Sequence, residues 1–499
     1  MQYQSTRNKK MSVSSAQAIK TGLSAEGGLF VPENIPSVSS AEMDAMTSMT
    51  YNERAYTVLK KFLTDYTDEE LWNCINKAYT KEKFETANIA PVYKLNGAQY
   101  FLELWHGPTC AFKDMALQIL PHLLTTAMAK TDEKDELIIL VATSGDTGKA
   151  ALEGFKDVSG TRIIVFYPSD GVSEIQKLQM ITQEGSNVGV AAVKGNFDDA
   201  QNGVKKIFTD VSYNAVLENN NFKLSSANSI NWGRLVPQIV YYFSAYADMV
   251  KGNEIKTGDK INVVVPTGNF GNILAAYYAK KMGLPIAKLI CASNSNNVLT
   301  DFINTGIYNK NREFHTTISP SMDILISSNL ERFLYDISDR DDTLIASLMK
   351  QLVENGSYEV DSRMKEKISQ LFYAGYCNDD KTRQAIKACK EEFGYVIDTH
   401  TAVAKVVHDE YISKTGDITK TVIASTASPF KFNQSVLIAL GGCEIVAGKD
   451  EFTLLDILSE KSGMSIPASL AELKHKNRIF DLVCDKEQMQ HVVSDFLNI

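Results

Sequence analysis

A glycine-rich loop lies between a buried-strand pattern and a helix pattern, and its residue types suit the binding of an anion. The run INVVVP at 261–266 is followed by Thr267 and then by the loop residues Gly268, Asn269, Phe270, Gly271 and Asn272. The glycines allow a tight turn whose N–H groups can converge on one point, and the helix behind them adds the positive end of its dipole. The spacing matches neither GxGxxG nor GxxxxGK[ST], so a dinucleotide or nucleoside triphosphate site is not indicated. The alternative interpretation is an ordinary turn between a strand and a helix.

A second loop of this kind follows the strand pattern LIILVA at 137–142. Hydroxyl and N–H groups at the start of a helix suit a carboxylate or a phosphate. The residues of this loop are Thr143, Ser144, Gly145, Asp146, Thr147 and Gly148. Asp146 either caps the helix or lies near a cationic cofactor or substrate, and the motif by itself leaves both roles open.

A lysine in a half-apolar setting is a candidate nucleophile or base. Lys113 ends the aromatic and small-residue stretch HGPTCAFK at 106–113 and precedes the helix pattern MALQILPHLL. An ordinary lysine amine has a pKa of about 10.4, and burial lowers the pKa of such a group so that it can act as nucleophile or base. Most lysines are solvated surface charges, so this stretch by itself suggests a reactive lysine but does not establish one. His106 is a candidate base, with a hydrogen-bonded structural histidine as the commoner role.

Two hydroxyl residues, Ser425 and Thr426, stand at the carboxyl end of the strand pattern TVIASTA at 421–427. A hydroxyl there can contact a heteroaromatic nitrogen of a ligand. The alternative is an ordinary pair of strand-end residues.

The elements that must position these residues are strands alternating with helices. The predicted strands are 137–143, 162–168, 188–195, 261–268, 287–293 and 421–427. Most are continuous runs of apolar, β-branched residues, as in a parallel sheet that is buried on both faces. Strand–helix alternation predicts an open α/β fold with ligands at the carboxyl ends of the strands. We expect a helical N-terminal unit at 1–95, an α/β region at 96–435 with a helical insertion or capping layer near 340–415, and a C-terminal extension at 436–499.

Composition excludes several classes of protein. The net charge of −9 argues against nucleic acid as the main partner, because phosphate backbones require a basic surface. No apolar run is long enough to span a membrane, and the polar start MQYQSTRNKKMSVSS is no signal peptide. The seven cysteines show no CxxC spacing, so no metal site is predicted and free thiols in the cytoplasm are expected.

Taken together, these stretches resemble the fold-type-II pyridoxal-phosphate enzymes (the tryptophan synthase β-like fold), and within them threonine synthases of the bacterial and fungal type. HGPTCAFKD at 106–114 is similar to the family pattern H-G-P-T-x-A-F-K-D. Further family motifs follow in order along almost the whole chain: STR at 5–7, EGGLFVP at 26–32, ATSGDTG at 142–148, SANSINWGR at 226–234, PTGNFGN at 266–272, SNSNN at 293–297 and DTHTAV at 398–403. Two departures lie outside the cofactor-facing motifs: Asn8-Lys9-Lys10 replaces a glycine, and Thr399 replaces a proline.

The resemblance implies roles for the candidate residues. Lys113 would hold pyridoxal 5'-phosphate covalently and act as the general base and acid. The loop from Gly268 through Asn272 would bind the phosphate of the cofactor, and Thr426, or with less support Ser425, would face the nitrogen of its ring. The residues that would bind the α-carboxylate of the substrate are Ser144, Gly145, Asp146 and Thr147.

The implied reaction converts O-phospho-L-homoserine and water into L-threonine and phosphate. Arg234 and Lys177 are candidates for the substrate phosphate, although each is more readily a structural or surface charge. A phospholyase or dehydratase that forms 2-oxobutyrate on the same scaffold is the alternative, and the motifs separate the two poorly. A non-catalytic cofactor carrier is disfavoured by the intact lysine motif, and a Rossmann dehydrogenase by the missing GxGxxG. We expect a monomer or a weak homodimer.

Overall fold

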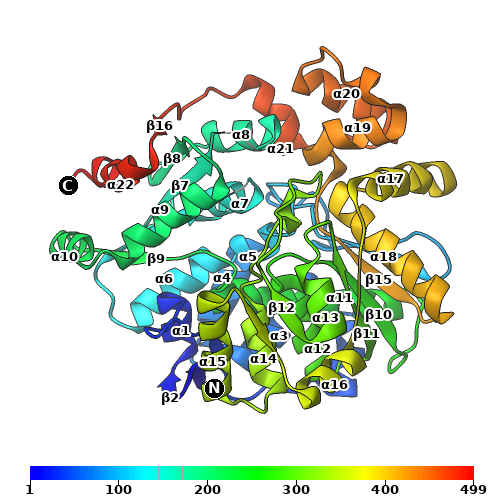
Figure 1. The fold of residues 1–499 in the computed structure, drawn as a ribbon, viewed down its shortest axis with the longest axis horizontal. Coiled ribbons are helices and arrows are strands. Elements are labelled where there is room, and N and C mark those ends of the chain that lie inside the picture. Colours follow the sequence, from blue (N-terminus) through cyan, green and yellow to red (C-terminus); the bar gives the residue numbers. More distant parts are fainter. Residues whose placement is uncertain (144, 170–171) are drawn as a thin grey trace.

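Two sheets of mainly parallel strands form the centre of the molecule (Figure 1). The structure is a computed structural model that describes residues 1–143, 145–169 and 172–499. The six-stranded sheet has the order β14 (Phe372–Tyr376), β11 (Ile286–Ser293), β10 (Ile261–Pro266), β15 (Thr421–Ser425), β5 (Gln99–Glu103) and β4 (Val92–Lys94). The five-stranded sheet has the order β16 (Val483–Cys484), β8 (Val188–Val193), β7 (Thr161–Pro168), β6 (Glu136–Ala142) and β9 (Phe222–Ser225). Within these described strands, only the β4–β5 pair is antiparallel.

The predicted strands form because their side chains are apolar on both faces. Every residue of β8 and of β10 is buried, as a parallel strand covered by helices on both sides requires. All six predicted strands are present, and the predicted α/β class is confirmed. The shorter strands β5, β9 and β14 are additional, since their mixed sequences give no continuous apolar run.

Helices cover the two sheets and connect most of their strands. Between β5 and β15 they are α5 (Asp114–Leu117), α6 (Leu120–Lys130), α7 (Asp146–Phe155), α8 (Glu174–Ile181), α9 (Phe197–Thr209), α10 (Val211–Asn219), α11 (Trp232–Lys251), α12 (Gly271–Lys281), α13 (Val298–Thr305), α14 (Leu330–Ile337), α15 (Asp342–Glu354), α16 (Ser362–Leu371), α17 (Asp379–Phe393) and α18 (Thr399–Thr415). A short 3-10 turn, η1 (Pro320–Met322), and the two-stranded sheet of β12 (Ile307–Asn309) and β13 (Ser357–Glu359) lie among them.

The N-terminal unit is mainly helical but also contains a small sheet. Its helices are α1 (Ser15–Thr21), α2 (Ser40–Met46), α3 (Tyr51–Phe62) and α4 (Asp68–Ala78). Its three strands are β1 (Tyr3–Ser5), β2 (Asn8–Val13) and β3 (Phe30–Pro32). The unit is joined to α11 by Arg54, a buried residue of α3 whose guanidinium lies 2.7 Å from the carboxylate of Asp248. It is joined to α14 by Arg7, which pairs with Glu331 at 2.7 Å.

The stretch near 340–415 does more than cap the fold. It contains the predicted helices, but β14 pairs with β11 at the edge of the six-stranded sheet, and α18 packs against β10, β11 and β15. The C-terminal residues follow the 3-10 turn η2 (Pro429–Phe432) as α19 (Asn433–Gly441), η3 (Cys443–Ile445), α20 (Glu451–Ser462), α21 (Ala468–Ala471), η4 (Glu472–His475), β16, η5 (Lys486–Gln488) and α22 (Met489–Leu497). α19 packs against α17, and the chain then runs to the five-stranded sheet, where β16 adds a parallel strand to β8 (Figure 1).

None of the described helices combines the length and the apolar character that crossing a bilayer requires.

Close contact between α7 and α5 generates a stability prediction. A Cβ atom at Gly154 of α7 would overlap the backbone carbonyl oxygen of Leu117 of α5, which cannot rotate away. Gly154→Ala should therefore lower the free energy of unfolding by about 1–3 kcal/mol, the usual cost of overpacking. Urea unfolding followed by circular dichroism measures the change.

Gly97→Ala is the matched control, because a Cβ atom at Gly97 meets nothing within 4 Å. An equal loss of stability in both variants would contradict the assigned contact between the two helices.

Candidate active site

Four loops that follow strands of the two sheets meet at one place. The loop after β5 carries Lys113, and it runs beside the chain that follows β15. Three backbone bonds join the two segments: the N–H of Leu104 donates to Ser425 O, that of Phe112 to Thr426 O, and that of Ser428 to Cys110 O. Residues 110–112, directly before Lys113, are thus held against the chain at the carboxyl end of β15.

The turn before Lys113 is closed by the buried carboxylate of Asp114. Thr109 donates its backbone N–H to Asp114 Oδ2 at 2.8 Å and its hydroxyl to Asp114 Oδ1 at 2.7 Å. Burial raises the pKa of Asp114 to about 6 and outweighs these two bonds, which lower it.

The amine of Lys113 faces a serine and a carboxylate. Its side chain is 11% exposed, and Nζ lies 3.2 Å from Ser321 Oγ and 3.4 Å from Asp146 Oδ2. Burial lowers the pKa of Lys113, Asp146 raises it, and the positive charges of Lys431 and Arg234 lower it further. The net shift is downward, which favours the neutral, nucleophilic amine that the sequence predicts at this position.

Asp146, the first residue of α7, is the acceptor around which the polar groups of the site are arranged. Lys431 Nζ lies 2.6 Å from its Oδ1, which also accepts from Gln176 Nε2 at 2.9 Å, while Ser321 Oγ donates to Oδ2 at 3.2 Å. Burial alone would raise the pKa of Asp146, but Lys431 and Lys113 hold that pKa well below its usual range. The residue is therefore a carboxylate.

The backbone beside Asp146 requires glycine. Gly145 has φ 137°, and a Cβ atom there would lie 2.5 Å from the amide of Gln176. Thr147 follows in the first turn of α7 and is half-buried. Ser144, the remaining predicted member of this loop, lies outside the described residues.

Neighbouring residues bind two carbonyl groups of the 268–272 loop, whereas its N–H groups have no partner in the described part of the chain. Ser327 Oγ donates to Gly268 O at 2.7 Å, and Asn269 O accepts from both the N–H and the Nδ2 of Asn329 at 3.1 Å. Within the described part of the chain, no hydrogen bond uses the N–H groups from Gly268 through Asn272. Phe270 has the left-handed φ of 62°, with its ring packed 5.8 Å from Phe333. Free N–H groups at the start of α12 suit a phosphate, as the sequence predicts.

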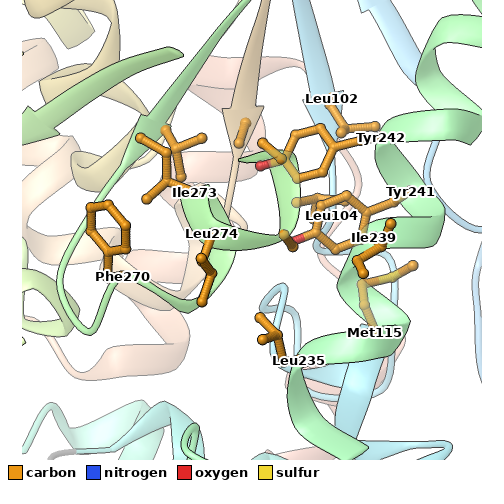
Figure 2. Packing of buried hydrophobic residues seen from close by; sticks show 14 of the residues in the cluster. Leu102, Leu104, Met115, Leu235, Ile239, Tyr241, Tyr242, Phe270, Ile273 and Leu274 are labelled. Atoms are coloured by element: carbon orange, nitrogen blue, oxygen red, sulfur yellow. The ribbon is translucent and has the colours of Figure 1, made fainter. Parts of the chain in front are cut away.

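Asn272 adds an oriented amide to this loop. Its Oδ1 accepts the hydroxyls of Tyr242 and of Tyr241, the latter at 2.7 Å, so that Nδ2 faces the other way, buried and without a partner among the described residues. The rings of both tyrosines lie among apolar side chains such as Leu104 and Ile239 (Figure 2). Packing thus fixes the amide with its donor available to a ligand.

The two hydroxyls at the end of β15 differ in their surroundings. Ser425 Oγ accepts from Trp105 Nε1 at 3.1 Å and from Thr401 Oγ1 at 3.2 Å. Thr426 is buried, and its hydroxyl makes no hydrogen bond with another described residue. Ser425 is therefore engaged inside the protein, whereas Thr426 is available to a ligand.

The other sequence candidates fall into two groups. His106 stacks on Trp105 and pairs through Nε2 with Glu103 at 2.7 Å, which is the structural role. Arg234 is buried, and its charge acts on Lys113, while Nη1 donates to Ala227 O and Nε lacks a partner in the described chain. Lys177 is half-buried on α8 and forms no ion pair with a described residue.

Three residues of the site were not among the sequence candidates: Gln176, Ser321 and Lys431. Lys431 is fully buried on η2. Its only local signal is its place between Phe430 and Phe432, an apolar setting like that of Lys113. Ser321 and Gln176 carry no local signal, because ordinary serine and glutamine residues of this kind occur throughout the chain.

Together these groups fit a phosphorylated cofactor that a lysine holds covalently: a buried amine of lowered pKa, a cradle of free N–H groups and an available strand-end hydroxyl. This is the class of site found in pyridoxal-phosphate enzymes. The family model "Pyridoxal-phosphate dependent enzyme" matches residues 85–415, and the model "Threonine synthase N terminus" matches residues 2–79.

Comparison with similar proteins indicates the family within this class of enzymes. A threonine synthase of Methylobacillus glycogenes is 37% identical over 88% of this chain and 92% of its own length. The structure of a PLP-bound threonine synthase from Brucella melitensis superposes with a TM-score of 0.88 at 33% identity, covering 99% of each chain. The human protein "Threonine synthase-like 1" is 43% identical over 85% of this chain, which spans 58% of that relative's length.

The chain belongs to the threonine synthase family of pyridoxal-phosphate-dependent enzymes. The fold is accordingly the expected fold type II, and the cofactor is the expected pyridoxal phosphate.

The buried Asp114 generates a prediction about pH. Because folding raises its pKa from an unfolded value near 3.8 to about 6, the folded state binds the proton more tightly. The proton-linked stabilisation is therefore complete only well below pH 3.8, and it is lost as the pH rises through about 6. Unfolding free energies of wild type minus those of Asp114→Asn should fall by about 2 kcal/mol between pH 4 and pH 7. A constant difference across this range would show that Asp114 titrates normally.

Proposed function

We propose that the protein is a threonine synthase that converts O-phospho-L-homoserine and water into L-threonine and phosphate. The observation that carries the proposal is the excess of positive charge at the site. Lys431 and Arg234 place two positive charges beside Lys113, where Asp146 is the one carboxylate among the described residues that act on it, next to a loop of free N–H groups. Such a site suits two phosphate groups, one of the cofactor and one of the substrate.

Each loop has a separate part in holding the cofactor. Lys113 is the covalent attachment point, the N–H groups from Gly268 through Asn272 and the Asn272 amide bind the phosphate, and the Thr426 hydroxyl faces the ring nitrogen. A neutral hydroxyl at this position leaves the ring nitrogen less positive than a carboxylate would. The available hydroxyl of Thr426 supports its assignment over Ser425.

The loop at the start of α7 binds the substrate carboxylate, together with Ser144. The carboxylate of Asp146 is itself turned to Lys431 and Gln176, and the Gly145 N–H donates to Thr143 Oγ1 at 3.0 Å. The donors toward the substrate are therefore the backbone N–H groups of Asp146 and Thr147 and the Thr147 hydroxyl. Negative charge at this helix start is stabilised by the dipole of the ten-residue α7.

Proton transfer is the chemical task of Lys113. When bound, the cofactor supplies an electron sink for negative charge that develops on the substrate carbons. The Lys113 amine, with its lowered pKa, accepts a proton from the α-carbon and from the β-carbon of the substrate and returns protons later. Arg234, whose buried Nε has no hydrogen-bond partner among the described residues, is the best candidate to bind the substrate phosphate that leaves.

A cytoplasmic location and a monomeric or weakly dimeric state belong to the same proposal. All seven cysteines are free, and only Cys443 among them is exposed, which suits a reducing compartment.

The proposal is tested by product analysis. Protein loaded with pyridoxal phosphate should convert O-phospho-L-homoserine into equal amounts of threonine and phosphate, quantified together with 2-oxobutyrate. Lys113→Ala should lower turnover by at least about 100-fold, since it removes the proton-transferring group. Lys134→Ala is the control, because that lysine side chain is 83% exposed.

Each outcome has a definite meaning. Phosphate accompanied by 2-oxobutyrate would replace the synthase with a phospholyase on the same site. No turnover by folded, cofactor-loaded protein would overturn both activities.

A further inference from the structure

Lys431 is a fully buried lysine whose charge belongs to the site but which has no assigned step in the proposed reaction. It lies on η2, and its ammonium group has two partners: Asp146 Oδ1 at 2.6 Å and the carbonyl oxygen of Thr109 at 2.8 Å. A buried ammonium group is costly unless it is paired and hydrogen-bonded, so both contacts are required for the group to stay charged. One contact reaches the site carboxylate, and the other reaches the loop that ends in Lys113.

Two ammonium groups share the carboxylate of Asp146. Lys431 is bound to Oδ1 at 2.6 Å, whereas Lys113 lies 3.4 Å from Oδ2. The Coulomb energy of an ion pair varies inversely with distance, and a hydrogen bond at 2.6 Å adds to it. Lys431 is therefore the principal counter-ion of Asp146, and Lys113 holds the weaker position.

The charges that face Lys113 come from three elements. Among the described residues that act most strongly on it, Asp146 of α7 is the anion, and Lys431 of η2 and Arg234 of α11 are the cations. A fourth element, η1, contributes the uncharged Ser321. The backbone N–H of Ser321 donates to Nε2 of His400 in α18 at 3.2 Å, so Nε2 of His400 acts as an acceptor. Apart from Lys113 itself, Lys431 is the one titratable group in the described part of the chain that contacts both the Asp146 carboxylate and the loop that carries Lys113.

We propose that Lys431 is a positioning residue that neutralises Asp146 and anchors the Thr109 carbonyl, and thereby leaves the amine of Lys113 free to react. The proposal rests on the assignment of Lys113 as the cofactor-binding lysine. Without Lys431, the whole charge of Asp146 would act on Lys113 and hold its proton. The positive charge of residue 431, and not its bulk, is the property that matters.

The test measures the reactivity of Lys113 in the full-length chain after removal of the cofactor. Limited acetylation with acetic anhydride over a range of pH, read by mass spectrometry, gives the apparent pKa of the Lys113 amine. Lys431→Met should raise this pKa by about one unit, which means about tenfold less free amine at a pH below both values. Lys431→Arg, which keeps the charge, should stay within 0.3 unit of wild type, and exposed Lys134→Met is the matched lysine control.

A second variant keeps the test decisive if Lys431→Met does not fold. Lys431→Gln keeps an amide that can donate to Asp146 but removes the charge, so it carries the same expectation if Lys431→Met does not fold. In the cofactor-loaded chain, the pH at which the visible absorption spectrum changes should rise in the same direction in either variant.

Folded Lys431→Met or Lys431→Gln protein with the wild-type Lys113 pKa would overturn the proposal. The proposal would also be overturned if Lys431→Arg raised the pKa of Lys113 as much as Lys431→Met does. The geometry of residue 431, rather than its charge, would then be responsible. Because no substrate is present, these results do not depend on which reaction the enzyme catalyses, and the product analysis separately decides the proposed function.

Discussion

The buried carboxylate of Asp146 is the constraint to which the other groups of the site conform. In a region largely shielded from water, a carboxylate stays ionised only with cationic and hydrogen-bonding partners. Lys431, Lys113, Gln176 and Ser321 fill these roles, and they come from four different segments. Any change in how the two sheets pack would therefore break the pairing of charges at this point.

The sheets make such a meeting possible because their strands are parallel. Loops at the carboxyl ends of parallel strands emerge on one side and often run into helices. Here the loop after β6 brings Asp146, the loop after β10 brings the free N–H groups, and the segment after β15 brings Thr426 and Lys431. Anion-binding helix starts and buried cations are thus concentrated in one region, which suits a phosphorylated cofactor and substrate.

The fold was largely predictable from apolar patterning. Six strands are recognisable in the sequence as continuous apolar runs, because a strand covered on both faces needs no polar positions. They are β6, β7, β8, β10, β11 and β15. β5 and β14 are absent from the predicted strands because QYFLE and FYAGY are short and mixed in character. The assignment of 340–415 as a capping layer misses β14 for the same reason, because membership of a sheet depends on partners elsewhere in the chain.

The sequence by itself determined the two glycine-containing loops, the lysine in its half-apolar stretch and the hydroxyls at the end of a strand. Each of these is a local pattern whose chemistry follows from neighbouring residues. Only the tertiary structure decided that Lys431 pairs with Asp146, that Ser425 is engaged while Thr426 is available, and that His106 is structural. The physical reason is that charge pairing and hydrogen bonding act over a few ångströms in space, between residues that lie up to several hundred positions apart in the chain.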